Sequence, residues 1–304
     1  MRSLAFVTLD VFTTTRFKGN PLAVVKLPNG QDVSTQQMQT IAFEFNLSET
    51  LFIHEQKSTE DGTPEWRVRI FFPTAELPFA GHPTIGAACY ALGTLANNVP
   101  RGRLICNAGP IEVDYEDGVA KASIPHNFHR HVEVPFSLEE VYELQPALKK
   151  ARVKLNAVDT LSPVKGMNFV SVELPNLKAL ESCSTTGVRP APTLDEGWRE
   201  GFAGSFWYVV TERSKGSAKV RTRMIEGALE DPATGSASCG LATFLALKWR
   251  ESRVVKFEMT QGVEMGRQSD VGVTVTLKED LEEAEKVELS GSAIKVMEGS
   301  VQYD

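Results

Sequence analysis

Short apolar runs rich in β-branched and aromatic residues recur along the chain, separated by glycine, proline and polar turn residues. Such runs are typical of β-strands. They occur in both halves of the chain, so the pattern predicts a protein with many strands and few helices. Strands are predicted at 5–11, 22–25, 51–54, 66–72, 111–115, 119–124, 168–174, 207–210, 220–225, 254–259, 271–277 and 293–296.

Four segments have the apolar spacing or the small-residue composition of helices. In Thr35–Phe45, the apolar residues recur every three or four positions, and Ser34 precedes the segment as an N-cap. The other helices are predicted at 83–95, 137–144 and 235–249. The proline-containing stretch 125–135 is predicted to be a linker, and the charged run 278–286 a solvated turn or short helix.

Residues 77–100 contain no Asp, Glu, Lys or Arg. A stretch of this length could span a membrane. The segment nevertheless holds prolines, glycines, His82 and two asparagines, and many of its other residues are small. A buried loop and helix is therefore the better interpretation. With no signal-like N-terminus either, we expect a cytoplasmic protein that does not bind membranes.

The composition narrows the possible classes of protein further. The chain has 304 residues, 42% of them hydrophobic, and a formal net charge of -7. The length predicts two domains or one large one, and the negative charge disfavours nucleic-acid binding. The four cysteines are widely spaced and form no CxxC motif, so neither a disulfide scaffold nor a zinc finger is expected.

The two halves share a pattern. Arg69 and Gly81 in the first half correspond to Arg223 and Gly235 in the second, both pairs being shifted by 154 positions. In each half the glycine opens a small-residue helix. A second match, Lys18-Gly19 with Lys165-Gly166, has an offset of 147. These matches favour an internal duplication, although chance was an open alternative.

A glycine at the start of a helix allows an anion to approach the unpaired N–H groups of the first turn. Gly81 and Gly235 could together hold a carboxylated small molecule, or each could simply make a tight turn. Asn20 and Thr234 lie in turns beside them. No glycine-rich nucleotide motif is present, so neither nicotinamide nor ATP has sequence support, and no cofactor is expected.

Four polar residues near these turns are candidates for chemistry. Glu49 lies at a strand entrance, and His82 lies at a helix start, where the dipole favours a neutral imidazole. Asp231 and Ser236 flank the second glycine. Each also has a structural interpretation: a solvated carboxylate for Glu49 and helix capping for the other three.

Histidines at 126, 129 and 131 form an HxxHxH pattern. Because the segment is predicted to be a linker and only Glu133 offers a nearby acidic ligand, no metal site is expected. Cys239 lies one turn inside the second small-residue helix, where a buried, inert thiol is the common outcome.

Four ordered motifs resemble the phenazine-biosynthesis PhzF-like family. They are DVFT with FKGNPLAVV in 10–25, NLSET at 46–50, PTAELPFAGHPT at 73–84 and EDPATGSA at 230–237. The family is similar in fold to diaminopimelate epimerase. The resemblance thus implies an α+β protein with two pseudo-symmetric domains, each a curved, mostly antiparallel sheet around a central helix, with the active site in the cleft between them. The predicted domains are 1–125, completed by a last strand at 298–304, and 126–297.

The resemblance also implies roles for individual residues. Glu49 matches the family's general acid/base, whereas His82 and Asp231 match residues that hold the substrate and assist proton transfer. Gly81 and Ser236 stand where related cysteine epimerases place two thiols, so a two-thiol racemisation is not expected. The remaining predicted substrate-binding residues are Asn20, Thr234 and Gly235.

The resulting hypothesis is a cofactor-independent isomerase that moves a proton between carbons of a small carboxylated substrate. Burial was expected to raise the pKa of the base. The resemblance implies a homodimer. Two alternatives remain: a non-catalytic binding protein that retains the fold, and a cysteine racemase that uses Cys89 or Cys239.

Overall fold

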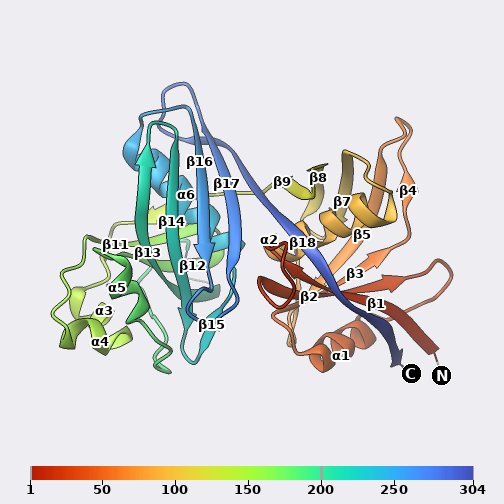
Figure 1. Cartoon of the computed structure of the whole chain (residues 1–304), viewed down its shortest axis with the longest axis horizontal. Helices are drawn as coiled ribbons and strands as arrows, with labels where there is room; N and C mark the ends of the chain where they lie inside the picture. Colours follow the sequence, from red (N-terminus) through yellow and green to blue (C-terminus); the bar gives the residue numbers. More distant parts are fainter. Residues whose placement is uncertain (1, 199–200, 304) are drawn as a thin grey trace. The chain divides into compact units, whose positions relative to one another are not determined.

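The computed structural model describes residues 2–198 and 201–303 (Figure 1). The chain divides into two compact units. Unit 1 comprises Met1–Ser123 and Leu289–Asp304, and unit 2 comprises Ile124–Glu288. The last strand therefore begins in unit 2 and ends in unit 1. Asp304, the end of the predicted final strand, lies outside the described residues.

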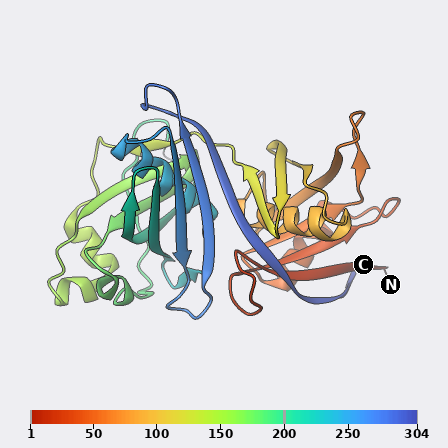
Figure 2. The ribbon, with the colours of Figure 1, turned by 45° about the horizontal axis from the view of Figure 1, so that its top comes forward.

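Unit 1 contains a mixed sheet in which antiparallel pairs predominate. Its strands are β1 (Arg2–Val11), β2 (Asn20–Leu27), β3 (Glu49–His54), β4 (Lys57–Ser58), β5 (Pro64–Phe71), β6 (Glu76–Leu77), β7 (Arg101–Cys106), β8 (Gly109–Glu116), β9 (Val119–Ser123) and the end of β18 (Ala284–Tyr303). The pairs β2–β3 and β5–β7 are parallel, and the pairs β1–β2, β3–β5, β7–β8 and β8–β9 are antiparallel. The first and last strands pair antiparallel, from Arg2 opposite Tyr303 to Val11 opposite Ala293, and lie side by side in Figure 2.

The sheet of unit 1 packs around a buried helix of small residues. Helix α2 (Gly81–Ala88) is buried from His82 to its end. A Cβ added to Gly86 would lie 2.6 Å from a Leu22 methyl and 2.8 Å from a Val11 methyl. Small side chains are therefore required here because the helix approaches β1 and β2 closely.

The predicted helix 83–95 differs from the structure in two respects. It begins two residues earlier, at Gly81, and its second half is a π-helix, η1 (Cys89–Leu95). The wider winding is evident where Ala96 N–H donates to the Ala91 carbonyl at 2.8 Å. Gly93, within the π-helix, lies against the Tyr115 ring, where a Cβ would meet the hydroxyl oxygen at 2.6 Å.

Helix α1 (Thr35–Phe45) has the predicted bounds. Ser34 accepts the Gln37 backbone N–H while the Gln37 side chain accepts the Ser34 N–H, which completes a capping box. The helix ends at Asn46 in the left-handed conformation.

Unit 2 has a second mixed sheet and its own buried helix. Its elements are β10 (His129–His131), α3 (Leu138–Leu144), α4 (Pro146–Lys150), β11 (Ala157–Val164), β12 (Gly166–Glu173), α5 (Leu177–Glu181), β13 (Gly201–Ser214), β14 (Ser217–Glu226), β15 (Leu229–Asp231), α6 (Gly235–Trp249), β16 (Val254–Gln261), β17 (Ser269–Leu277) and the start of β18. Helix α6 has the predicted bounds and is buried over most of its length.

The two units repeat one order of strand pairings. In unit 2, β12–β13 and β14–β16 are parallel, whereas β11–β12, β13–β14 and β16–β17 are antiparallel. This is the order found from β1 to β8 in unit 1. The small-residue helix follows the corresponding short strand in both, β6 in one and β15 in the other. The shared topology supports the duplication predicted from the sequence.

Several predictions about the second half were wrong or incomplete. The stretch 125–135 is not a plain linker, because β10 lies within it and pairs antiparallel with β11. Ser137 is the N-cap of α3 and not its first residue. The charged run 278–286 forms a turn and then enters β18. Strand β11 and the short helices α4 and α5 were not predicted.

Among the described helices, none is long and apolar enough to cross a membrane. The uncharged segment 77–100 instead supplies α2 and η1, as the interpretation of a buried loop and helix predicted.

Candidate active site

Glu49 and His82 meet inside unit 1. Glu49 is the first residue of β3, and His82 is the second residue of α2. The Glu49 Oε2 atom lies 3.0 Å from His82 Nδ1, and both side chains are largely buried. Residues that are 33 positions apart in sequence thus form a pair that can share a proton.

The pairing determines the charge of Glu49. Burial acts to raise the pKa of its carboxyl group, but the charge and hydrogen bond of His82, together with a hydrogen bond from Ser48, outweigh burial and lower the pKa below its ordinary value. The expectation of a raised pKa was therefore wrong. Glu49 is a carboxylate at neutral pH, which is the form that can accept a proton.

The far side of the His82 ring offers a hydrogen-bonding atom that is not in use. Within the described residues, His82 Nε2 is buried and has no hydrogen-bond partner. A buried polar atom without a partner costs free energy, so it is a feature to be explained by function. The atom is available to a small molecule bound at the start of α2.

The first turn of α2 has no side-chain cap. Its N-cap, Ala80, makes no side-chain hydrogen bond to the N–H groups of the turn, and Gly81 adds no side chain there. Asn20 is buried at the start of β2, and its Oδ1 accepts the Ser48 hydroxyl at 3.3 Å. The structure therefore brings Asn20, Glu49, Gly81 and His82 into one part of unit 1.

The other predicted site residues lie together in unit 2. Asp231 ends β15, and its Oδ2 accepts the Thr234 hydroxyl at 2.5 Å. Thr234 is the N-cap of α6 but does not cap the helix with its side chain. Gly235 and the half-buried Ser236 lie in the first turn, which lacks a side-chain cap, as the start of α2 does.

Gln261 organises this turn and was not identified from the sequence. The fully buried amide donates to the Asp231 carbonyl at 2.8 Å and to Thr234 Oγ1 at 3.1 Å, and its oxygen accepts the Thr234 N–H at 3.3 Å. The following Gly262 has a positive φ, and a Cβ there would lie 2.8 Å from the Pro232 carbonyl oxygen. The Gln-Gly pair at the end of a strand was the available sequence signal.

The cysteines lack the properties of catalytic thiols. All four are buried and free. Burial raises the pKa of both Cys89 and Cys239 to about 12, so neither forms a thiolate at neutral pH. Cys239 is therefore the buried, inert thiol that the sequence predicted.

Comparison with known proteins identifies relatives over the whole chain. A relative from Mesorhizobium japonicum, described as an uncharacterized isomerase, is 31% identical, and the match covers 99% of each chain. The trans-2,3-dihydro-3-hydroxyanthranilate isomerase of Pseudomonas chlororaphis is also 31% identical, over 97% of this chain and 98% of its own. These names confirm the prediction of an enzyme of the isomerase class that acts on a small molecule.

The fold has a counterpart of known structure. The crystal structure of a phenazine biosynthesis protein of the PhzF family from Bacillus anthracis aligns with a TM-score of 0.79 at 23% identity, covering 100% of both chains. The model of the family described as phenazine biosynthesis-like protein matches residues 9–299. The chain therefore belongs to the phenazine biosynthesis-like, or PhzC-PhzF, family.

Proposed function

We propose that the protein is a cofactor-independent isomerase in which Glu49 takes a proton from one carbon of a small carboxylated substrate and returns it to another. The observation that carries the proposal is the buried Glu49–His82 pair, with its 3.0 Å contact, beside an open helix start. A general base requires the ionised form and a fixed position, and His82 provides for both.

His82 would serve as the partner of the base during transfer. While Glu49 is a carboxylate, His82 Nδ1–H donates to it. Once Glu49 has taken a proton on its other oxygen, Oε1, His82 Nδ1–H still donates to Oε2, so no proton has to leave the ring. The unpartnered Nε2 could hydrogen-bond to a polar group of the substrate at the start of α2. The open first turn of α2 at Gly81 would hold a substrate carboxylate near Asn20.

We further propose that the matched residues of unit 2 take part in the same reaction. Asp231 and Ser236 would assist proton transfer, and Thr234 and Gly235 would bind the substrate. Two observations support this: the units are related copies, and each offers a helix start whose N-cap side chain does not cap the helix. The hydrogen bond from Thr234 and the amide of Gln261 fix the Asp231 segment for such a role.

The name of the Pseudomonas chlororaphis relative supplies the first substrate to test. We propose a cyclic or amino acid-like carboxylate for this chain, and trans-2,3-dihydro-3-hydroxyanthranilate is the probe. The purified protein would be incubated with the probe and with a panel of related cyclic carboxylates, and conversion followed by proton NMR. The same panel would be used in a thermal-shift assay.

Comparison of Glu49→Gln with Glu44→Gln makes the test specific. Glu44 is an exposed carboxylate on α1, so its amide variant controls for loss of charge nearby. We expect conversion by the wild type and by Glu44→Gln, and a loss of conversion in Glu49→Gln with the probe still bound. Equal conversion by all three proteins would contradict the role of Glu49. Thermal stabilisation without any conversion would favour a non-catalytic binding protein.

The predicted homodimer stays part of the proposal. Size-exclusion chromatography with light scattering would test it, and a mass of about one chain, 33.4 kDa, would contradict it.

A further inference from the structure

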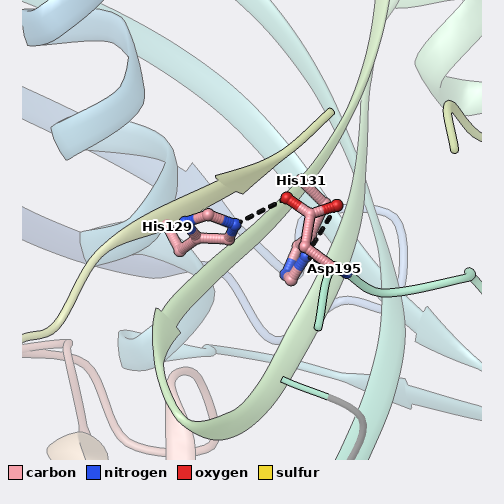
Figure 3. Close-up of side chains that lie close together, drawn as sticks. All are labelled: His129, His131 and Asp195. Carbon is pink, nitrogen blue, oxygen red and sulfur yellow. Dashed lines mark hydrogen bonds and ion pairs between the residues drawn. The ribbon is translucent and has the colours of Figure 1, made fainter. Parts of the chain in front are cut away.

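Two histidines and an aspartate, none of them proposed for catalysis, lie together in unit 2. His129 and His131 occupy alternate positions of β10, so their side chains share one face of the strand. Asp195, 64 positions beyond His131, lies against them (Figure 3). The candidate ligand atoms of the three residues all lie within 4.8 Å of one another. No metal was expected from the histidine pattern, partly because only Glu133 offers an acidic ligand nearby in sequence. Asp195 is an acidic group from a distant part of the chain.

The hydrogen bonds of His131 leave its Nδ1 lone pair directed at Asp195. The Ser162 hydroxyl donates to Asn168 Oδ1 at 2.6 Å, so the Ser162 oxygen accepts from His131 Nε2–H at 2.8 Å. The Nδ1 atom is then unprotonated, and it accepts the Asp195 backbone N–H at 3.0 Å. Metal-binding histidines are usually fixed in this way, with the second ring nitrogen donating to a neighbouring group.

The Asp195 carboxylate is buried, and no lysine or arginine among the described residues forms an ion pair with it. It accepts the backbone N–H groups of Val132 and Glu133, and its Oδ2 lies 2.7 Å from His129 Nε2. In the described part of the chain, its ion-pair partners are the two histidines alone. A buried anion with two imidazoles beside it suits a divalent cation electrostatically.

We propose that His129, His131 and Asp195 bind a divalent transition-metal ion of the zinc class, with water completing the coordination. Two imidazole nitrogens and one carboxylate oxygen form a ligand set that zinc accepts. The ion would fasten the Asp195 segment to β10. This site is independent of the proposed isomerase chemistry.

Binding requires a small rearrangement of existing hydrogen bonds. Ligand atoms about 2.1 Å from a tetrahedral ion are separated by about 3.4 Å, more than the 2.7 Å between His129 Nε2 and Asp195 Oδ2. The ion would take the place of the proton between these two atoms, and the neutral His129 ring would then carry its proton on Nδ1, after exchange with solvent. The ion would also take the place of the Asp195 N–H at His131 Nδ1. The backbone donors at Val132 and Glu133 can remain in place.

Trp198 provides a local reporter. Its ring stacks on His129, with centroids 4.9 Å apart and planes inclined by 10°, and meets His131 edge-on at 5.9 Å. Rotation of His129 toward a metal would change the surroundings of the indole. Tryptophan fluorescence should therefore respond to binding.

The experiment titrates Zn²⁺ into the full chain after dialysis against a chelator, using calorimetry and tryptophan fluorescence. Co²⁺ is added in a parallel titration because its visible absorption reports on coordination. The variants are His129→Ala and Asp195→Asn. His126→Ala is the matched control, because it removes a histidine from the same stretch, outside the cluster. Circular dichroism checks that each variant is folded.

The proposal predicts one ion per chain in the wild type and in His126→Ala, and affinity lower by at least about tenfold in His129→Ala and Asp195→Asn. Ser162→Ala should weaken binding by a similar factor, because it removes the group that fixes the His131 tautomer. The absence of saturable binding in the wild type would overturn the proposal. So would unchanged affinity in His129→Ala and Asp195→Asn, which would assign the cluster to hydrogen bonding alone.

Discussion

The two units share a topology but differ at matched positions. Leu22 of β2 pairs with Glu49, and the matching residue of β12, Phe169, pairs with Gly204. A Cβ at Gly204 would lie 2.9 Å from the Phe202 ring and 3.2 Å from the Met224 sulfur, so the second copy has no room for a carboxylate there. The two units therefore share a topology, but at this position only unit 1 has room for a buried base.

The first turns of α2 and α6 also differ between the two units. His82 in unit 1 corresponds to Ser236 in unit 2, and only His82 is paired with a glutamate at the strand entrance. In unit 2, the polar network instead fixes the turn before the helix through Asp231, Thr234 and Gln261. Under the proposed function, this difference would make proton transfer the task of unit 1 and substrate positioning the main task of unit 2.

Substitution of one carboxylate in each unit should give the largest difference in activity between the two units. Loss of the base in Glu49→Gln should lower kcat by a factor of about 10²–10⁴. Asp231→Asn keeps a group of similar size and should have a smaller effect, about tenfold, with a larger share in KM. Steady-state kinetics on the substrate found in the screen measures both. Equal losses in kcat would contradict the division of tasks.

A matched ion pair tests the structural side of the comparison. Arg69–Glu76 and Arg223–Glu230 both have two-point contacts at 2.7–2.8 Å. The Arg223 side chain is only 6% exposed and also donates to the Cys183 carbonyl at 2.5 Å, whereas that of Arg69 is 16% exposed.

We therefore expect Arg223→Met to destabilise the protein by about 3–5 kcal/mol, because a buried carboxylate is left without its partner. Arg69→Met should cost about 1 kcal/mol, since solvent reaches that pair. Urea unfolding followed by circular dichroism gives both free energies of unfolding. A larger loss for Arg69→Met would contradict the burial argument.

The pH dependence of activity should sharpen the role of His82. Since His82 lowers the pKa of Glu49, the wild-type acid limb of kcat/KM should lie below the ordinary glutamate value of 4.5. In His82→Asn the contribution of burial remains and that of the imidazole is lost, so the Glu49 pKa rises and the limb moves to higher pH. Comparison of the pH–rate profiles of the wild type and His82→Asn measures this shift. An acid limb at the same pH in both proteins would contradict the effect of His82 on the Glu49 pKa.

The smallest effect is expected from the thiols. Alkylation under native conditions should leave activity unchanged, because Cys89 and Cys239 are buried and un-ionised. Activity and the number of modified cysteines, counted by mass spectrometry, are measured together. Loss of activity in step with modification of Cys239 would revive a thiol mechanism.

Local signals in the sequence predicted the elements whose ends are set locally. Ser34 and its capping box define the start of α1, and the small-residue run from Gly235 defines α6. The four motifs predicted the family, and the arginine and glycine offsets predicted the repeat.

Features that depend on distant parts of the chain were missed. β10 forms because β11 offers an edge for pairing, and nothing in 125–135 indicates that edge. Asp195 and Gln261 act through partners about 30 to 65 positions away. The lowered pKa of Glu49 required knowledge that His82 contacts it, because burial alone predicts the opposite direction.

The central claim is that Glu49 moves a proton between substrate carbons, and isotope exchange tests it most directly. The wild type, Glu49→Gln and Glu44→Gln would each be incubated with substrate in deuterated water, and the product carbons examined by NMR and mass spectrometry. The account predicts deuterium at the protonated carbon with the wild type and Glu44→Gln, and none above background with Glu49→Gln. Deuterium incorporation by Glu49→Gln at the wild-type rate would contradict it.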